Sequence, residues 1–101
     1  MYEYRAKLIR AVDGDTIDCE VDLGFNVFAR LRFRLASVDT PERGHPGFHE
    51  ATDELLELIA GVEDEDGWFP LWSEKTGKYG RWIANIEGVT DVMSWNYPYR
   101  R

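Results

Sequence analysis

The chain has 101 residues, of which 44% are hydrophobic and 31% charged, and its formal net charge is −7. This length suits one compact domain, residues 1–101, and no apolar run approaches the ~20 residues that a membrane span requires. An evenly spread negative charge would argue against binding nucleic acid. The acidity is concentrated, however, because residues 44–67 hold eight Asp or Glu and no Lys or Arg. The remainder is near neutral and leaves room for a local basic face.

Cys19 is the single cysteine, so the chain forms no internal disulfide and a reducing compartment is expected. The N-terminus alternates like a strand and lacks the apolar segment of a secretory signal. We therefore expect a cytoplasmic protein, with secretion as the alternative if a signal was removed. No membrane partner is expected, and the sequence does not decide between a monomer and a weak oligomer.

Residues 2–38 contain three predicted strands joined by short turns. The first covers residues 2–12, where a slip in alternation at Leu8-Ile9 predicts a β-bulge. Asp13-Gly14-Asp15 is a turn signal, and the second strand, residues 16–23, places Cys19 on its apolar face. The third strand, residues 27–38, has two contrasting faces: an apolar one with Val27, Ala29, Leu31, Phe33 and Leu35, and a basic one with Arg30, Arg32 and Arg34.

The second half of the chain begins with a Pro- and Gly-containing loop and a predicted amphipathic helix, residues 48–60, ended by Gly61. Two more strands follow, residues 68–74 and 81–87, separated by a loop over 75–80; Pro70 argues for an edge position. Thr90 is a candidate cap for a short helix through Met93. The predicted fold is α+β and mostly β: a small five-stranded OB-type Greek-key barrel with a helix after the third strand and a short C-terminal helix or tail.

Oxygen-bearing side chains gather at the first turn and after the third strand. Asp15, Asp39 and Thr40 could supply the hard oxygen ligands that Ca²⁺ or Mg²⁺ prefers, with Glu42 nearby. Simple turn chemistry explains the same residues equally well. Arg34 and Arg81 are suited to phosphate because a guanidinium matches its oxygens bidentately, although exposed arginines are common on strands and hairpins.

Other residues are weaker candidates. Pro46 and Gly47 break the i, i+4 spacing of His45 and His49, which disfavours a metal site there. Cys19 lies on an apolar strand face, which disfavours a nucleophile. Four aromatic side chains could stack on bases but more often pack in a core: Trp68, Phe69, Trp72 and Trp82.

Three segments together resemble the thermonuclease, or staphylococcal-nuclease-like, family. They are Val12-Asp13-Gly14-Asp15-Thr16, the stretch from Phe33-Arg34-Leu35 through Val38-Asp39-Thr40-Pro41-Glu42, and Lys78-Tyr79-Gly80-Arg81. They occur in this order, and the resemblance covers about residues 4 to 93. It implies an OB-type barrel that hydrolyses DNA and RNA with Ca²⁺ and leaves 3′-phosphates.

The resemblance also implies roles for individual residues. Asp15, Asp39 and the Thr40 carbonyl would bind Ca²⁺, or another divalent cation, with Asp13 near the metal but no firm ligand. Glu42 would act on the attacking water, and Arg34 and Arg81 would bind the phosphate. Lys78 and Tyr79 would lie near the phosphate end of the nucleotide. Attack on a phosphodiester builds negative charge, which a cation and two arginines stabilise.

The expected function is therefore a Ca²⁺-dependent endonuclease acting on DNA or RNA, with single strands preferred. The alternative is a non-catalytic module of the same fold that binds nucleic acid or a protein. A third reading is a shortened relative completed by a partner chain, which an apolar patch of Trp68, Trp72, Met93 and Trp95 would favour. Few residues follow Gly88, the helix is strongly acidic, and Trp95, Tyr97 and Tyr99 have no assigned role.

Overall fold

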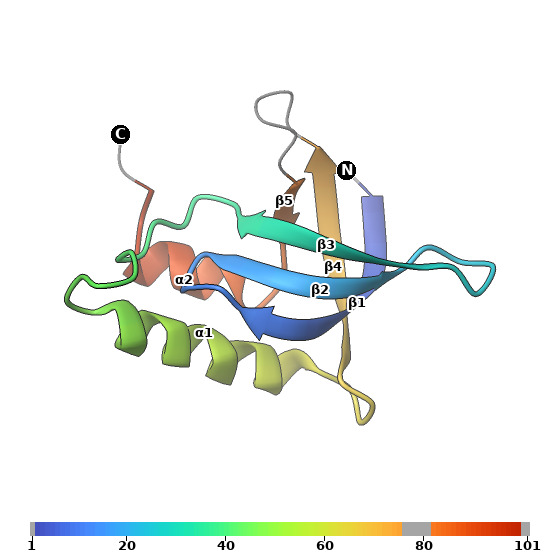
Figure 1. Cartoon of the computed structure of the whole chain (residues 1–101), viewed down its shortest axis with the longest axis horizontal. Coiled ribbons are helices and arrows are strands. Elements are labelled where there is room, and N and C mark those ends of the chain that lie inside the picture. The colour runs from blue at the N-terminus through green and yellow to red at the C-terminus, as the bar shows by residue number, and fades with distance from the viewer. Residues whose placement is uncertain (1, 76–81, 100–101) are drawn as a thin grey trace.

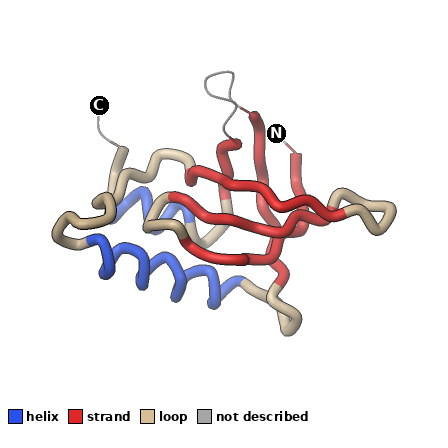
Figure 2. Tube along the Cα trace, viewed as in Figure 1, coloured by secondary structure: helices blue, strands red, loops and turns tan. Residues whose placement is uncertain are grey.

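The computed structural model describes residues 2–75 and 82–99. In chain order its elements are β1 (Tyr2–Ala11), β2 (Thr16–Asp22), β3 (Phe28–Leu35), α1 (Phe48–Val62), β4 (Trp68–Lys75), β5 (Trp82–Asn85) and α2 (Thr90–Asn96). The strands form one closed barrel in the order β1-β2-β3-β5-β4, as Figures 1 and 2 show. The prediction of a five-stranded OB-type barrel with a helix after the third strand is confirmed.

The first three strands form an antiparallel meander. Strand β2 pairs with β1 on one side and with β3 on the other, and the β1–β2 register shifts between Leu8 and Arg10. This shift is the bulge that the slip in alternation predicted. The meander places the Asp13–Asp15 turn beside the end of β3, because Thr16 pairs with Arg34.

The barrel closes through two pairings that are distant in sequence. β4 runs antiparallel to both β1 and β5, and β5 runs parallel to β3. Pro70 pairs with Arg5 of β1 and precedes the stretch of β4 that pairs with β5, so its missing N–H costs the ladder nothing on that side. Closure leaves no free sheet edge among these five strands.

The core fills the barrel and continues under the two helices. Its fully buried members include Ile17, Cys19 and Phe33 from the barrel, Leu55 and Ile59 from α1, and Met93 from α2. In Figure 1, α1 runs along one end of the barrel with α2 beside it. The apolar stripe predicted for the helix is confirmed, because its acidic residues lie mainly on the exposed side. Within the described ranges, no helix is long and apolar enough to span a membrane.

Strand β3 is shorter than the predicted 27–38. Its end after Leu35 follows from a turn in which Ser37 has a φ of 61°, which breaks the extended backbone. The predicted core face was wrong at its start: Val27 is 52% exposed, whereas Phe33 and Leu35 are buried. The turn end of the β2–β3 hairpin projects beyond the other strands (Figure 2), and its apolar side chains are exposed, so alternation there has no interior to face.

Two predicted ends of elements were also wrong. Gly61 lies inside α1, which continues to Val62, because the helix end is supported by a Glu63 N–H bond to the Ile59 carbonyl. Thr90 does not cap α2 from outside; it is the first helical residue, and its hydroxyl accepts the N–H of Ile86 at 2.8 Å. The helix extends to Asn96, and the fifth strand covers Trp82–Asn85 within the predicted 81–87.

Candidate active site

The buried carboxylate of Asp15 joins two of the predicted motif segments. One of its oxygens lies 2.9 Å from Nη1 of Arg34 and accepts the Thr16 hydroxyl at 2.8 Å. The other oxygen accepts the backbone N–H of Thr40 at 3.1 Å. Asp15 is only 7% exposed, so these donors replace the water that a carboxylate would otherwise bind. The turn after β1, the end of β3 and the Thr40 segment therefore meet at one point.

The two turn carboxylates differ in their affinity for protons. Burial acts to raise the pKa of Asp15, but hydrogen bonds from Asp13, Thr40 and Thr16 and the charge of Arg34 outweigh it, so its pKa is lowered. Burial, with the neighbouring Asp15 adding to it, raises the pKa of Asp13 to about 6. Asp13 also accepts the Asp15 N–H at 3.0 Å. Asp15 is thus held ionised, which a metal ligand requires.

Gly14 allows the turn to approach Thr40 closely. A Cβ at this position would lie 2.8 Å from Cγ2 and 2.9 Å from Oγ1 of Thr40, and 3.0 Å from Cβ of Ala51. The Thr40 hydroxyl is buried and has no hydrogen-bond partner among the described residues. The glycine of the Asp-Gly turn signal therefore has a packing role in addition to its turn role.

Asp39 is exposed and directly precedes Thr40 in the chain. Its backbone N–H donates to the Tyr97 carbonyl at 2.9 Å, and the Tyr99 N–H donates to the Ser37 carbonyl at 3.1 Å. Val38 and Pro98 form an isolated β-bridge between these bonds. The segment after α2 therefore lies alongside residues 37–39 and holds the backbone of Asp39 in place.

The same tail reaches Arg34 and α1. The Arg34 guanidinium carbon lies 5.9 Å from the centroid of the Tyr99 ring, close to the limit for a cation–π contact. The Asn96 amide donates to the Glu54 carboxylate, and burial followed by the Glu54 contact raises the pKa of Tyr97. The sequence left Tyr97 and Tyr99 without a role. Their alternation across Pro98 resembles a short strand, which is the signal that could have identified the tail as part of this site.

The remaining predicted residues lie at different places. Glu42 is exposed in the loop before α1, where its carbonyl accepts the His45 N–H at 3.0 Å. Arg81, Lys78 and Tyr79 lie outside the described residues, so their expected roles stay predictions. His45 and His49 are both exposed.

The aromatic candidates divide between the core and the surface. Phe69 is buried in the core, whereas Trp68 and Trp72 are half-buried. We predicted that an apolar surface patch of Trp68, Trp72, Met93 and Trp95 would favour a partner chain. The prediction was wrong for Met93, which is fully buried in the core.

The oxygen-only donor set is of the type that suits a hard cation. Residues 2–75 and 82–99 contain no group of three His, Cys, Asp or Glu side chains placed to hold a metal. A site here would instead combine two carboxylates with a backbone carbonyl. A carboxylate offers about four acceptor positions. On Asp15, contacts with Arg34, Thr16 and Thr40 occupy three of these positions, and a hydrogen bond from Asp13 adds a fourth.

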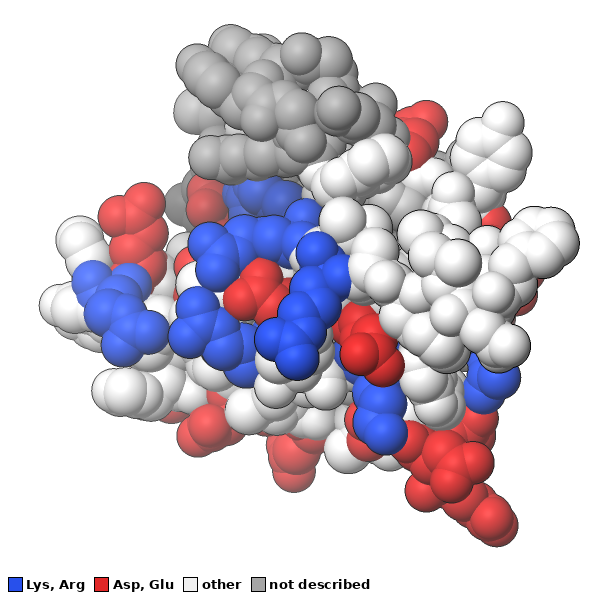
Figure 3. Space-filling view, turned by 45° about the vertical axis from the view of Figure 1, so that its right-hand side comes forward, with Lys and Arg blue, Asp and Glu red and all other residues white. Residues whose placement is uncertain are grey.

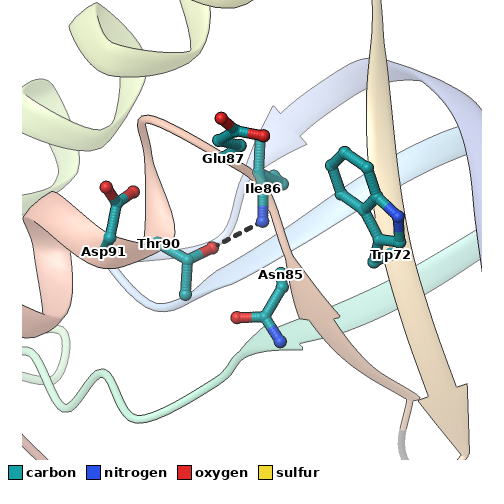
Figure 4. A pocket seen from close by; sticks show the side chains of 6 residues that line it. All are labelled: Trp72, Asn85, Ile86, Glu87, Thr90 and Asp91. Carbon is teal, nitrogen blue, oxygen red and sulfur yellow. Dashed lines mark hydrogen bonds between the residues drawn. The ribbon is translucent and has the colours of Figure 1, made fainter. Parts of the chain in front are cut away.

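A separate pocket of about 440 Å³ lies where β4, β5 and α2 meet (Figure 4). In this view Trp72 lies at one side, Asp91 at the other, and Asn85, Ile86, Glu87 and Thr90 lie between them. None of the predicted site residues lines it. Two carboxylates make it unsuited to an anionic ligand, so it does not compete with the Asp15 region as a phosphate site.

Comparisons with known proteins give one finding on the class of protein. No family model matches the chain. The chain is similar to a curated protein from Shigella flexneri named micrococcal nuclease, with 27% identity over 115 residues. The matched region covers 96% of this chain, which spans 60% of the length of that relative. This identity supports a nuclease-like family and nothing closer.

Proposed function

We propose that this protein is a metal-dependent endonuclease that hydrolyses phosphodiester bonds of DNA or RNA. The observation that carries the proposal is the buried Asp15 carboxylate, which ties Arg34 at 2.9 Å to the backbone of Thr40 at 3.1 Å. A salt bridge and a backbone bond hold the ends of two loops together beside the exposed Asp39. The nuclease name of the Shigella flexneri relative supports the same reaction class.

In the proposed site, Arg34 binds the phosphate and stabilises the negative charge that develops during attack. A guanidinium has five N–H donors, and its Nη1 contacts Asp15. Within residues 2–75 and 82–99 no ion pair uses its other nitrogens, which leaves them for an anion. Glu42 takes a proton from the attacking water, and its exposed position gives solvent access. Arg81 supplies a second positive charge, with Lys78 and Tyr79 contacting the nucleotide.

A divalent cation, with Ca²⁺ as the first candidate, would be held by the carboxylates of Asp15 and Asp39 and the carbonyl of Thr40. It would supply positive charge for the phosphate oxygens. The residues of this chain fit a hard cation because Asp15 is held ionised and all three donors are oxygens. We further propose that the products carry 3′-phosphates and that single strands are preferred.

The test is cleavage of denatured DNA and of RNA with added Ca²⁺, added Mg²⁺ or a chelator. Four proteins are compared: wild type, Glu42→Gln, Arg81→Ala and Glu57→Gln. Loss of a general base typically costs 10²- to 10⁴-fold in rate, and loss of one charge-stabilising donor about 10²- to 10³-fold. Glu57 is exposed on α1, so Glu57→Gln is a matched control that should cleave like the wild type.

The results separate the proposal from its alternative. Wild-type protein that binds oligonucleotide but cleaves nothing with any metal would overturn the enzyme and leave a binding module. Cleavage that Glu42→Gln and Glu57→Gln reduce equally would overturn the role of Glu42. Identification of the terminal phosphate on the products tests the 3′-phosphate assignment.

A further inference from the structure

The β2–β3 hairpin exposes apolar side chains that no part of the described structure covers. We call residues 23–27 the hairpin tip; it projects beyond the barrel at the right of Figure 1. Phe25 is 99% exposed, and Leu23 and Val27 at the tip and Phe28 just beyond it are each about half exposed, at 46%, 52% and 48%. Single exposed apolar residues are ordinary, but four in six consecutive positions form a patch of the kind that contacts a partner.

The backbone conformation at the hairpin tip is unfavourable for Phe25. Phe25 and Asn26 have φ values of 55° and 59°, and the Val27 N–H donates to the Gly24 carbonyl at 2.8 Å, which defines a type I′ turn. Asn suits this conformation, whereas a bulky side chain such as Phe does not. The turn presents an aromatic ring to solvent in a strained conformation, and packing within the described chain does not account for it.

Aromatic and basic side chains lie together on the outer face next to the tip. The Phe28 ring lies 6.0 Å from that of Trp68, measured between centroids. Trp68 also lies below two cations, with Arg5 at 5.4 Å and Lys7 at 5.8 Å from its centroid. Arg5 forms an ion pair with Asp64 at 3.0 Å, and Lys7 pairs in register with Glu20. We call Phe25, Phe28, Trp68 and the cations beside them the aromatic–basic face.

A row of arginines connects this face to the candidate active site. Phe28, Arg30, Arg32 and Arg34 alternate along β3 and so share one side of the sheet, about 6.6 Å apart at twice the strand rise. Asp18 binds both Arg32, at 2.8 Å, and Arg10, at 3.1 Å, so one carboxylate serves two cations. Glu20 and Asp22 lie opposite Arg30 and Phe28.

The positive charge of Arg30 is available to bind a ligand. It takes part in no ion pair within the described residues. A hollow of about 420 Å³ is lined by Arg10, Arg30 and Arg32 around Asp18, and Ile9 and Leu31 complete its lining. Figure 3 shows basic side chains crowded around acidic ones over these strands.

We propose that the aromatic–basic face and the arginines of β3 bind the part of a single-stranded nucleic acid that extends beyond the cleavage site. Bases would stack on Phe25, Phe28 and Trp68, and phosphates would contact Arg30 and Arg32 on the way to Arg34. Exposed rings beside cations match the alternating bases and phosphates of an unpaired strand. The inference rests on the proposed function, because the row of arginines ends at that site.

The test is binding of labelled oligothymidylate in the presence of a chelator, so that the result does not depend on cleavage. Oligomers of about 4 and about 16 nucleotides bracket the site sizes usual for such folds. We expect Phe25→Ala to weaken binding of the long oligomer by about tenfold and of the short one far less. Arg30→Ala should lower the salt dependence of long-oligomer binding by about 0.7 in the slope of log affinity against log salt.

Three further variants make the result specific. Phe25→Trp keeps an aromatic ring and should bind like the wild type, whereas Phe25→Leu keeps only apolar surface and should bind like Phe25→Ala. Trp95→Ala removes another highly exposed aromatic ring, 87% exposed on α2, and should leave binding unchanged. Circular dichroism checks that each variant is folded.

The outcomes distinguish this inference from the proposed function. Equal affinity of wild type and Phe25→Ala for the long oligomer overturns the inference, even if cleavage is normal. Binding that depends on Phe25 in a protein that cleaves nothing supports the binding face and overturns the enzyme. If Phe25→Ala instead abolishes self-association or vesicle binding while oligomer affinity is unchanged, the face serves another partner and the inference is wrong.

Discussion

Gly14 packs closely against Thr40 and Ala51 in the candidate active site. A Cβ there would lie 2.8 Å from Cγ2 of Thr40 and 3.0 Å from Cβ of Ala51, and both neighbours are short and buried. We expect Gly14→Ala to lower the free energy of unfolding by about 1–3 kcal/mol, because neither neighbour can move away easily. The urea midpoint measures this loss. Adding Thr40→Ser, which removes Cγ2, should recover part of it.

Gly61 provides the matched control. It lies inside α1, and a Cβ added there would have no other atom within 4 Å, so Gly61→Ala should raise the free energy of unfolding by about 0.5–1 kcal/mol. Equal urea midpoints for wild type and Gly14→Ala would contradict the close packing of the turn against Thr40.

The raised pKa of Asp13 predicts an unusual pH dependence of the free energy of unfolding. Its pKa is raised to about 6 from 3.8, so the folded state keeps a proton that the unfolded state loses between about pH 4 and pH 6. The free energy of unfolding should therefore fall as pH rises through this window, by on the order of 1 kcal/mol after allowance for solvent screening. Above about pH 6 the contribution of the Asp13 proton to stability is fully lost.

Asp13→Asn should remove this decline while keeping an oxygen that accepts the Asp15 N–H. Urea unfolding at several pH values in chelator measures the difference from wild type, with Asp53→Asn on the exposed side of α1 as control. The lowered pKa of Asp15 acts in the opposite direction, because its contribution to stability is lost as pH falls below about 4. Parallel curves for wild type and Asp13→Asn would show that Asp13 does not titrate this way.

The C-terminal tail acts as a structural element although it is too short to form a strand of the barrel. Its Tyr97 carbonyl accepts a hydrogen bond from the Asp39 N–H, and its Tyr99 N–H donates to the Ser37 carbonyl. The Tyr99 ring also contacts Arg34. Deleting residues 97–101 should lower the free energy of unfolding by about 1–3 kcal/mol, since these bonds are lost beside the fully buried Val38.

The same deletion should also reduce cleavage, because Asp39 loses the partner of its backbone N–H. Deletion of residues 100–101 alone is the control, since the hydrogen bonds involve residues 97 and 99. Nuclease assays and thermal unfolding of both truncated proteins measure the two effects. A tail deletion with wild-type stability would show that the pairing contributes nothing.

The closed barrel as a whole protects its single thiol. Cys19 is 0% exposed, and burial, with a smaller contribution from Asp18, raises its pKa to about 12. Native protein at about pH 8 should therefore not react with a thiol reagent, and reaction should appear in urea together with loss of the circular dichroism signal. Rapid reaction without denaturant would mean that β2 opens locally.

Charge is distributed unevenly over the molecule. Residues 44–67 carry eight acidic residues and no basic one, and they form α1 and the loops beside it. The outer face of β1–β3 carries arginines around a central column of acids. The net charge of −7 therefore does not describe the face on which we propose that nucleic acid binds.

Local patterns in the sequence were sufficient for much of this structure. Alternation predicted β1, β2 and the bulge, and helical periodicity predicted α1. These features depend on neighbours within a few positions, so they are readable without knowledge of the fold. The same reasoning failed at Val27, because alternation shows which side chains share a face but not where the core ends.

The tertiary structure alone decided how distant residues meet. The parallel pairing of β3 with β5, the Asp15–Arg34 ion pair and the position of the tail beside residues 37–39 all join segments that are far apart in the chain. Their energy comes from burial and from bonds between segments that are not neighbours in the sequence, so no local pattern contains them. By itself the sequence determined which groups are available for chemistry and the order of the elements that carry them. The pairing of the strands and the packing of the tail determined which of those groups are in contact, because these contacts join distant parts of the chain.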